Sequence, residues 1–318
     1  MYLQTRRVRP CGSRDGSRIS AHGKLYVQAI ILWLAFALVA RDARAQEPCD
    51  LCAQNWLFIL GAGGRTGSTT ALSMFRLVPH VELTGEHQGV LNGQYEMYKR
   101  LAKMRHTSVA SAGPRLDMDG FRCVTQELVR VMVFGKRRAS EQSQTRIVGF
   151  KEIAYTSWHM LSFLKFTFPC SRWIFSVREK LDVPVKSNFN ATRLRLEWGK
   201  QRLLADCVHK AFPNTIFRLA VEQLSVQVYN DALHHLLGVR NCSFKGILSA
   251  NLDGKFSREP DTEALREKQT ERARREYIDG DCDLSNVSFR LSSEHLEQNR
   301  VLWYALNAEY QSRLRNQT

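Results

Sequence analysis

The fold is decided by one stretch of the chain, residues 56–70, which reads WLFILGAGGRTGSTT. Trp56 to Leu60 form a continuous apolar run with the length of a buried strand. Gly61-Ala62-Gly63-Gly64 follows at once, and Gly67 to Leu77 has its apolar residues at helical spacing. The stretch therefore predicts a buried parallel strand, a glycine-rich loop and a helix.

A glycine-rich loop between a strand and a helix is suited to bind an anion. Glycines let the backbone wrap the anion closely, and the helix N-terminus presents free N–H groups and the positive end of its dipole. We expect the ligand to be a phosphate. The Walker pattern does not fit, because Ser68 rather than Lys follows Gly67. The dinucleotide fingerprint does not fit either, because Thr66 stands where its third glycine belongs.

The rest of the chain alternates strand-like and helical stretches. Further short apolar runs occupy residues 146–150, 172–177 and 215–220, and helical stretches occupy residues 181–190, 198–212 and 223–237. This alternation predicts an α/β, P-loop-like three-layer fold with a central, mostly parallel sheet flanked by helices. It places a single domain over residues 56–318.

Three further segments have a less regular pattern. Residues 99–145 are polar and basic, which indicates an insertion that shapes a substrate cleft. Residues 253–280 are rich in charge and predict a solvated helix, and residues 292–315 predict a final amphipathic helix.

The composition excludes several classes of protein. Of 318 residues, 44% are hydrophobic, 10% aromatic and 24% charged, so the chain is not disordered, collagen-like or a polytopic membrane protein. The net charge of +15 favours anionic ligands, because the summed field concentrates negative partners. Zinc-finger spacing and an RNA-recognition aromatic motif are both missing from the sequence, so we expect no nucleic acid as a partner.

The N-terminus has the pattern of a targeting segment. Residues 1–24 form a basic tail, residues 25–40 are uncharged and mostly apolar, and residues 41–55 form a stem. The basic side precedes the apolar segment, so the tail stays in the cytosol and the rest of the chain enters the secretory lumen. We expect a single-pass type II membrane anchor. The alternative is secretion after signal cleavage near Ala45, since Ala43-Arg44-Ala45 is an A-x-A site.

If the chain is lumenal, its cysteines lie in an oxidising compartment and its sequons can be glycosylated. Seven cysteines follow the leader, so most of them should pair and one should be left over. Cys49-Asp-Leu-Cys52 precedes the first strand, which favours a structural disulfide over a redox pair, and no second pair completes a zinc site. Four sequons follow the apolar segment, at Asn190, Asn241, Asn286 and Asn316.

The order base, Thr, Gly, Ser, Thr, Thr after a strand resembles the 5′-phosphosulfate loop of sulfotransferases. These enzymes use 3′-phosphoadenosine-5′-phosphosulfate (PAPS) as the donor. Four further segments resemble the family in the same order, over residues 56–240: Thr84-Gly85-Glu86, Gly149 to Ile153, Ser176-Val177-Arg178 with Ser187, and Phe217 to Val239. The Gly-Glu pair is similar to that of the lumenal tyrosylprotein and related sulfotransferases.

The chain also departs from the family pattern. Arg178 and Ser187 are nine positions apart, whereas many members have eight, and Pro184 lies between them. Proline is tolerated in the first turn of a helix, so a late helix start could still deliver Ser187. The glycine-rich basic segment near the C-terminus of the cytosolic branch has only a weak counterpart, Gly254 to Arg258.

The resemblance implies roles for the donor-binding residues. The 5′-phosphate should be held by Arg65, Thr66, Gly67, Ser68, Thr69 and Thr70. Arg65 should also neutralise the charge that develops on the bridging oxygen. Arg178 and Ser187 should bind the 3′-phosphate, which distinguishes PAPS from ATP. Sulfuryl transfer requires no metal by this logic.

The resemblance also implies roles on the acceptor side. Glu86 is the candidate general base, with the adjacent His87 as the alternative. Lys151, at the carboxyl end of a strand, should contact the sulfonate or the substrate. Glu222 and the pair His234-His235 are expected to be structural.

The expected function is a Golgi-type sulfotransferase that acts on a hydroxyl of a glycan or glycoprotein. A tyrosylprotein sulfotransferase is one alternative. A catalytically inactive secreted or anchored binding protein with the same fold is another, and a P-loop kinase is a third reading. Keeping Arg65, Glu86 and Arg178 together favours an enzyme over a binder, and the missing Walker Lys disfavours a kinase.

Overall fold

The computed structural model describes residues 49–61, 65–105, 117–135, 139–181, 190–248 and 263–315. The chain divides into two compact units, Met1–Cys49 and Asp50–Thr318, and the description that follows concerns the second. The predicted tail, targeting segment and cleavage site lie outside the described residues, as do Ser187 and Gly254 to Arg258.

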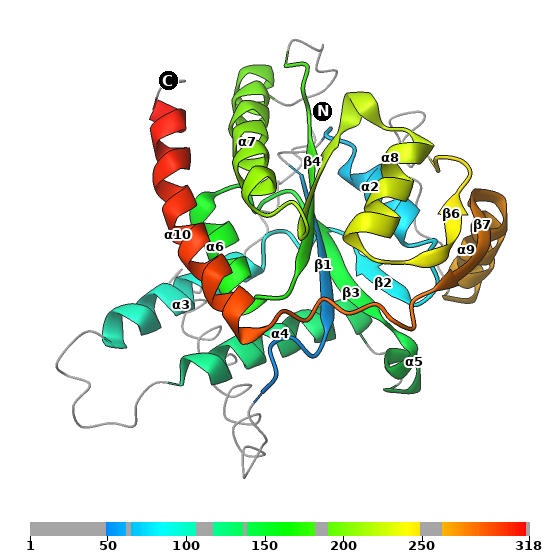
Figure 1. The fold of residues 1–318 in the computed structure, drawn as a ribbon, viewed down its shortest axis with the longest axis horizontal. Coiled ribbons are helices and arrows are strands. Elements are labelled where there is room, and N and C mark those ends of the chain that lie inside the picture. Colours follow the sequence, from blue (N-terminus) through cyan, green and yellow to red (C-terminus); the bar gives the residue numbers. More distant parts are fainter. Residues whose placement is uncertain are drawn as a thin grey trace, which may run out of the picture. The chain divides into compact units, whose positions relative to one another are not determined.

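A five-stranded sheet forms the centre of the Asp50–Thr318 unit (Figure 1). Its strand order is β2-β3-β1-β4-β5, and every neighbouring pair is parallel. The strands are β1 (Asn55–Gly61), β2 (Val81–Thr84), β3 (Ile147–Glu152), β4 (Arg172–Val177) and β5 (Ile216–Ala220). The predicted α/β fold with a parallel sheet between helices is confirmed.

The central strand β1 is apolar throughout because both of its faces are buried. Trp56, Phe58 and Leu60 belong to one hydrophobic core, and Leu57 and Ile59 belong to the other. Successive side chains of a strand point to opposite faces, so a sheet covered on both sides needs a continuous apolar run rather than an alternating one. The run Trp56 to Leu60 meets that need.

Helices cover both faces of the sheet (Figure 1). On the face of Phe58 lie α3 (Leu91–Arg105), α4 (Met118–Phe134), α6 (Trp158–Thr167), α7 (Ala191–Ala211) and α10 (Ser293–Arg315). On the face of Ile59 lie α2 (Ser68–Phe75), α8 (Val226–Asp231), a π-helical turn η3 (Ala232–Leu236) and a hairpin of β6 (Arg240–Phe244) and β7 (Ile278–Asp283). The helix α9 (Glu263–Tyr277) leads into β7, α5 (Ala139–Gln144) precedes β3, and a 3₁₀ turn η2 (Val221–Gln223) follows β5.

Several segments differ from their predicted structure. The segment 99–145, predicted to be an insertion, includes all of α4 and α5, and α4 packs its buried face into the core. The solvated helix predicted for residues 253–280 is confirmed for α9, but from Ile278 the chain forms β7 instead. The helix predicted over residues 181–190 falls mainly outside the described residues, and Asn190 is the N-cap of α7.

The predicted pairing of most cysteines is confirmed. Cys52 is bonded to Cys170 and Cys242 to Cys282, while Cys49 and Cys123 are also disulfide-bonded. Among the described cysteines Cys207 is free, and it is buried. The motif Cys49-Asp-Leu-Cys52 therefore does not close on itself.

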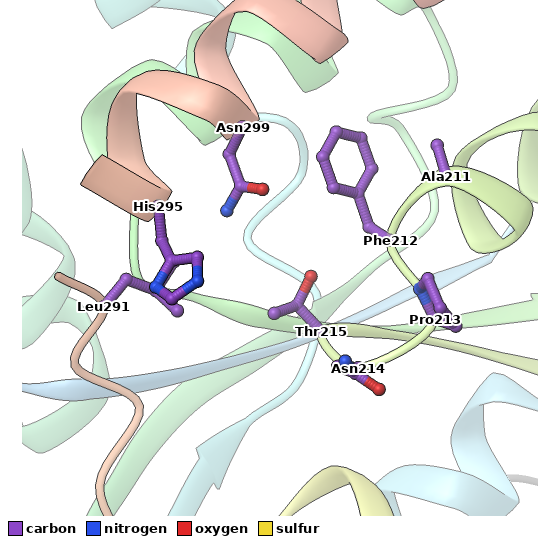
Figure 2. A pocket seen from close by; sticks show the side chains of 8 residues that line it. All are labelled: Ala211, Phe212, Pro213, Asn214, Thr215, Leu291, His295 and Asn299. Atoms are coloured by element: carbon purple, nitrogen blue, oxygen red, sulfur yellow. The ribbon is translucent and has the colours of Figure 1, made fainter. Parts of the chain in front are cut away.

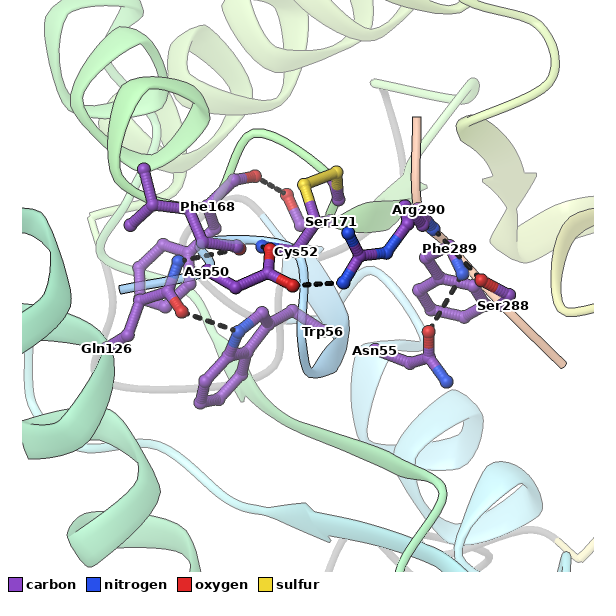
Figure 3. The surroundings of a disulfide bond; sticks show 12 residues. Asp50, Cys52, Asn55, Trp56, Gln126, Phe168, Ser171, Ser288, Phe289 and Arg290 are labelled. Atoms are coloured by element: carbon purple, nitrogen blue, oxygen red, sulfur yellow. Dashed lines mark hydrogen bonds and ion pairs between the residues drawn. A yellow bond between two sulfur atoms is a disulfide. The ribbon is translucent and has the colours of Figure 1, made fainter. Parts of the chain in front are cut away.

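The Cys52–Cys170 disulfide lies in a dense polar network at the start of β1 (Figure 3). Gln126 of α4 accepts a hydrogen bond from Trp56 Nε1 and donates to the carbonyls of Leu51 and Thr167. Asp50 forms an ion pair with Arg290. These contacts fasten residues 50–52 to α4, to the turn before β4 and to the segment before α10.

None of the described helices is long and apolar enough to cross a membrane. The disulfides suit a secreted or lumenal protein, because such bonds persist in oxidising compartments.

Candidate functional site

The polar residues singled out in the sequence lie at the carboxyl ends of the parallel strands, which we call the carboxyl edge of the sheet. Arg65 follows β1 and Glu86 follows β2, while Lys151 lies near the end of β3. Arg178 follows β4, and Glu222 follows β5. Ligands of open parallel sheets bind at this edge, where the loops after the strands meet. The predicted site residues within the described ranges therefore share one edge.

The N-terminus of α2 is open for a ligand. Gly67 is the N-cap, with a left-handed φ of 84°, and no side chain caps the helix. A side chain on Gly67 would be strained by this φ and would also crowd Val221, because its Cβ would lie 2.9 Å from Val221 Cγ2. The first N–H groups of a helix lack partners within the helix, so those at Ser68 to Thr70 are available to an anion.

Arg65 and Thr66 present different groups to this edge. The Arg65 side chain is exposed and has no ion-pair partner among the described residues. Thr66 is fully buried, and its Oγ1 has no hydrogen-bond partner within the part of the chain that the structure describes. A Cβ on Gly61 would lie 2.8 Å from this hydroxyl, so the glycine keeps open the space beside it.

The backbone of the loop is tied to the end of β4. Ser176 Oγ donates a hydrogen bond to the Thr66 carbonyl at 2.5 Å. Arg178 donates two to the Arg65 carbonyl, from Nε at 2.9 Å and from Nη2 at 2.7 Å. Arg65 itself has a φ of 60°, and these bonds hold it in that left-handed conformation.

Lys151 and Glu86 form an ion pair. Lys151 pairs with Ile59 across the sheet and therefore lies on the face covered by α2. The Lys151 side chain is 5% exposed and the Glu86 side chain 38% exposed, so the pair reaches from the sheet to the surface. The structure brings together these two predicted catalytic residues.

His87, the alternative base, has a different environment. Its Nε2 lies 2.6 Å from Thr84 Oγ1, and its ring packs edge-on against Phe150. Burial lowers the pKa of His87 from its ordinary value, and the nearby Glu152 carboxylate offsets part of this effect. Its ring is therefore neutral at neutral pH, with one nitrogen already engaged.

Arg178 contacts an aromatic ring and a carboxylate besides the loop backbone. Its guanidinium lies over the Trp198 ring at 5.1 Å from the centroid, and its Nη1 is 3.6 Å from Glu222 Oε1. Glu222 accepts hydrogen bonds from the backbone N–H groups of Glu179 and Lys180, which lower its pKa against the opposing effect of burial. The structural role expected for Glu222 agrees with these contacts.

Sequence reasoning assigned no role to two residues of this edge, Ser176 and Glu152, although both lie in segments that resemble the sulfotransferases. Glu152 is the last residue of β3, and its buried carboxylate accepts hydrogen bonds from the loop after β2. The sequence signal that could have identified Glu152 is its position, because a carboxylate at the end of a parallel strand lies at the edge of the sheet where ligands bind.

A separate pocket of about 290 Å³ lies at the opposite edge of the sheet (Figure 2). It lies where α7 turns into β5, against the first turns of α10, and its lining includes Phe212, Thr215, His295 and Asn299. Because Thr215 precedes β5, this pocket is not part of the candidate site.

Within the described ranges, no group of three or more His, Cys, Asp or Glu residues is placed to hold a metal ion. His234 Nδ1 lies 3.0 Å from the Val239 carbonyl, a contact that serves the turn after η3.

Comparisons with known proteins do not identify a family for this chain. No protein-family model and no curated protein matches the chain. Among solved structures, a sugar kinase from Janibacter sp. HTCC2649, in an unliganded structure, is 12% identical over 57% of this chain and 94% of its own, with a TM-score of 0.30. A likeness of this size bears on neither fold nor function.

Proposed function

We propose that the Asp50–Thr318 unit is a PAPS-dependent sulfotransferase that transfers a sulfuryl group to a hydroxyl of a glycan. The observation that carries the proposal is the uncapped N-terminus of α2 beside the exposed Arg65, on the same sheet edge as the Lys151–Glu86 pair and Arg178. The order of these residues along the chain is the order in which they resemble the sulfotransferase segments.

The residues around the loop fit a phosphosulfate group. The unpartnered Thr66 hydroxyl and the space kept open by Gly61 lie beside the start of α2, where N–H groups favour an anion. Arg65 adds a positive charge at the surface. The donor supplies the sulfuryl group and a phosphate leaving group, and the chain supplies binding, orientation and proton acceptance.

Glu86 is suited to take a proton from an acceptor hydroxyl. Its Oε1 accepts a hydrogen bond from Lys151 Nζ, which leaves Oε2 for the acceptor. Since the Lys151 side chain is almost fully buried, it holds Glu86 from the sheet side while the carboxylate stays accessible. Arg65 would meanwhile neutralise negative charge on the leaving group.

Arg178 is positioned for a 3′-phosphate. Two of its guanidinium nitrogens serve the Arg65 carbonyl, and Nη1 faces Glu222 at a distance longer than a hydrogen bond. A phosphate near Nη1 would therefore gain a charged donor. Ser187, the second proposed 3′-phosphate ligand, lies outside the described residues.

The acceptor and the compartment belong to the proposal as well. A lumenal, membrane-anchored Golgi location agrees with the disulfides and with the predicted N-terminal anchor. Glycan hydroxyls are our first choice of acceptor, and protein tyrosine is the alternative.

The test is nucleotide selectivity. The full chain, produced in a eukaryotic secretory host, should be stabilised against heat far more by adenosine 3′,5′-bisphosphate than by AMP or ATP at equal concentration. Equal stabilisation by the bisphosphate and AMP would overturn the PAPS assignment, and preference for ATP would favour a kinase. Labelled PAPS with a panel of glycans and peptides then identifies the acceptor.

A further inference from the structure

We infer that Glu152 is a positioning residue that holds the segment Gly85–Gly89, and with it Glu86, at the carboxyl edge of the sheet. Glu152 Oε2 accepts hydrogen bonds from the backbone N–H groups of His87 and Gly89, both at 3.1 Å. The inference rests on the proposed function for the role given to Glu86.

The Glu152 carboxylate is satisfied by backbone groups alone. Its Oε1 accepts from the N–H groups of Ile153 at 2.8 Å and Ala154 at 3.1 Å, so four N–H donors converge on one side chain that is 1% exposed. Among the described residues no Lys or Arg forms an ion pair with it. A buried carboxylate is costly unless such donors surround it, so the segment and the carboxylate depend on each other.

The segment turns sharply at Gln88, whose backbone conformation is unfavourable for a residue with a side chain. Gln88 has a left-handed φ of 54°, whereas the φ of 71° at Gly89 is one that glycine adopts readily. Gly89 is packed closely, since a Cβ there would lie 2.7 Å from Asn92 Nδ2 and 3.4 Å from the Ala154 side chain. Glu152 binds N–H groups on both sides of Gln88, which fixes the turn.

Glu152 and Lys151 hold the same segment from opposite faces of β3. Neighbouring residues of a strand point to opposite faces, and Lys151 takes the α2 face. Lys151 fixes the Glu86 side chain through the ion pair, while Glu152 fixes the backbone that follows it. The position of the proposed base is thus set by two consecutive residues of one strand.

Glu152 does not act as the base itself. It is almost completely buried, and both of its oxygens already accept two hydrogen bonds. A group that cannot reach an acceptor hydroxyl contributes by orientation alone, and a misplacement of about 1 Å can cost ~10²-fold in rate.

The test compares Glu152→Gln with the full-length wild-type chain. The amide keeps the shape but turns donor hydrogens toward N–H groups, so part of the anchor is lost. Asp117→Asn is the matched control, because Asp117 also accepts two backbone N–H groups, from Asp119 and Gly120, but caps α4. Hydrogen exchange at the His87 and Gly89 amides is measured along with turnover and affinity for adenosine 3′,5′-bisphosphate.

We expect Glu152→Gln to speed exchange at both amides at least ~10-fold and to lower kcat ~10- to 100-fold, with bisphosphate affinity unchanged. Asp117→Asn should change neither the exchange of these amides nor kcat. Unchanged exchange in Glu152→Gln would overturn the anchor, and faster exchange with unchanged kcat would overturn the positioning role. If the wild-type chain neither prefers the bisphosphate nor transfers sulfate, the proposed function fails, while amide exchange still decides whether Glu152 holds the segment.

Discussion

The Arg178 guanidinium grips the main-chain carbonyl of Arg65 with two hydrogen bonds, from Nε at 2.9 Å and Nη2 at 2.7 Å. The residue proposed for the 3′-phosphate thus also holds the loop proposed for the 5′-phosphate. The two phosphate sites are joined by one side chain, so a change at Arg178 should affect both.

Arg178→Lys should weaken binding of adenosine 3′,5′-bisphosphate by about tenfold or more. Lysine keeps the charge but cannot bond the Arg65 carbonyl through a planar fork while it serves a phosphate. Affinity for AMP should fall less, because AMP has no 3′-phosphate. Calorimetric titration of both nucleotides checks this, with Arg193→Lys in the first turn of α7 as the control. Equal losses for both nucleotides would count against a 3′-phosphate contact.

Glu86→Gln should lower turnover by ~10² to 10⁴ with donor affinity nearly intact, the usual contribution of a positioned base. Glutamine retains an oxygen that can accept from Lys151 Nζ, but the lysine loses its counter-charge, so the variant must first be shown to fold. Steady-state rates on the acceptor found in the PAPS panel provide the measurement. If the variant retains near-full turnover, the base is misassigned and His87 becomes the residue to replace.

Arg65→Ala should differ from Glu86→Gln in its effect on binding. Removing the guanidinium takes away charge neutralisation at the leaving group, where the loss of one transition-state donor commonly costs ~3 kcal/mol. It should also weaken donor binding, because the ground state is already anionic. The Arg65 carbonyl bonds to Arg178 are made by the backbone and stay in place. If Arg65→Ala remains fully active, the loop only binds phosphate and Arg65 takes no part in sulfuryl transfer.

The sequence predicted the core of the fold because its signals are local. The apolar run of β1, the glycines after it and the helical spacing of α2 all lie within one stretch. In contrast, β2 was not predicted. It has only four residues, their burial alternates, and β2 is the outermost strand on one side of the sheet. The helix α6 is buried over most of its surface, so it shows no amphipathic period.

The candidate site was predictable as far as strand order fixes it. Arg65, Glu86, Lys151 and Arg178 share an edge because residues at the ends of parallel strands must meet there. The role of Glu152 depends on N–H groups of a loop distant in sequence, and the partner of Cys52 is Cys170 rather than its near neighbour Cys49. Contacts of this kind are set by tertiary packing and leave no local pattern.

Lys165→Met should stabilise the protein at neutral pH. Lys165 is buried with no hydrogen-bond partner for Nζ among the described residues, and its nearest compensation is the Trp173 ring at 5.7 Å. Burial lowers the pKa of Lys165 from 10.5 to about 8. Between these two values the unfolded chain binds more protons, so wild-type stability rises with pH there. Below pH 8 the folded protein bears the full free-energy cost of burying the charged lysine, which is up to ~3 kcal/mol from the size of the pKa shift.

Denaturant unfolding at pH 7 and pH 9.5 measures this difference. The advantage of Lys165→Met should be largest at pH 7 and should shrink at pH 9.5, where the wild-type lysine is mostly neutral when folded. An advantage that does not change with pH would mean that packing, rather than charge, accounts for the effect.

The sequons Asn241 and Asn286 should carry glycans, if the Asp50–Thr318 unit is lumenal as proposed. Both asparagines are exposed, whereas Asn190 uses its Oδ1 to cap α7. Asn241 has a φ of 61°, a conformation that asparagine tolerates better than most residues, so its replacement would strain this irregular position in β6. Ser243→Ala and Ser288→Ala remove the two sequons without that strain. Each should lose one glycosidase-sensitive step in gel mobility, and a wild-type chain with no such step would contradict the prediction.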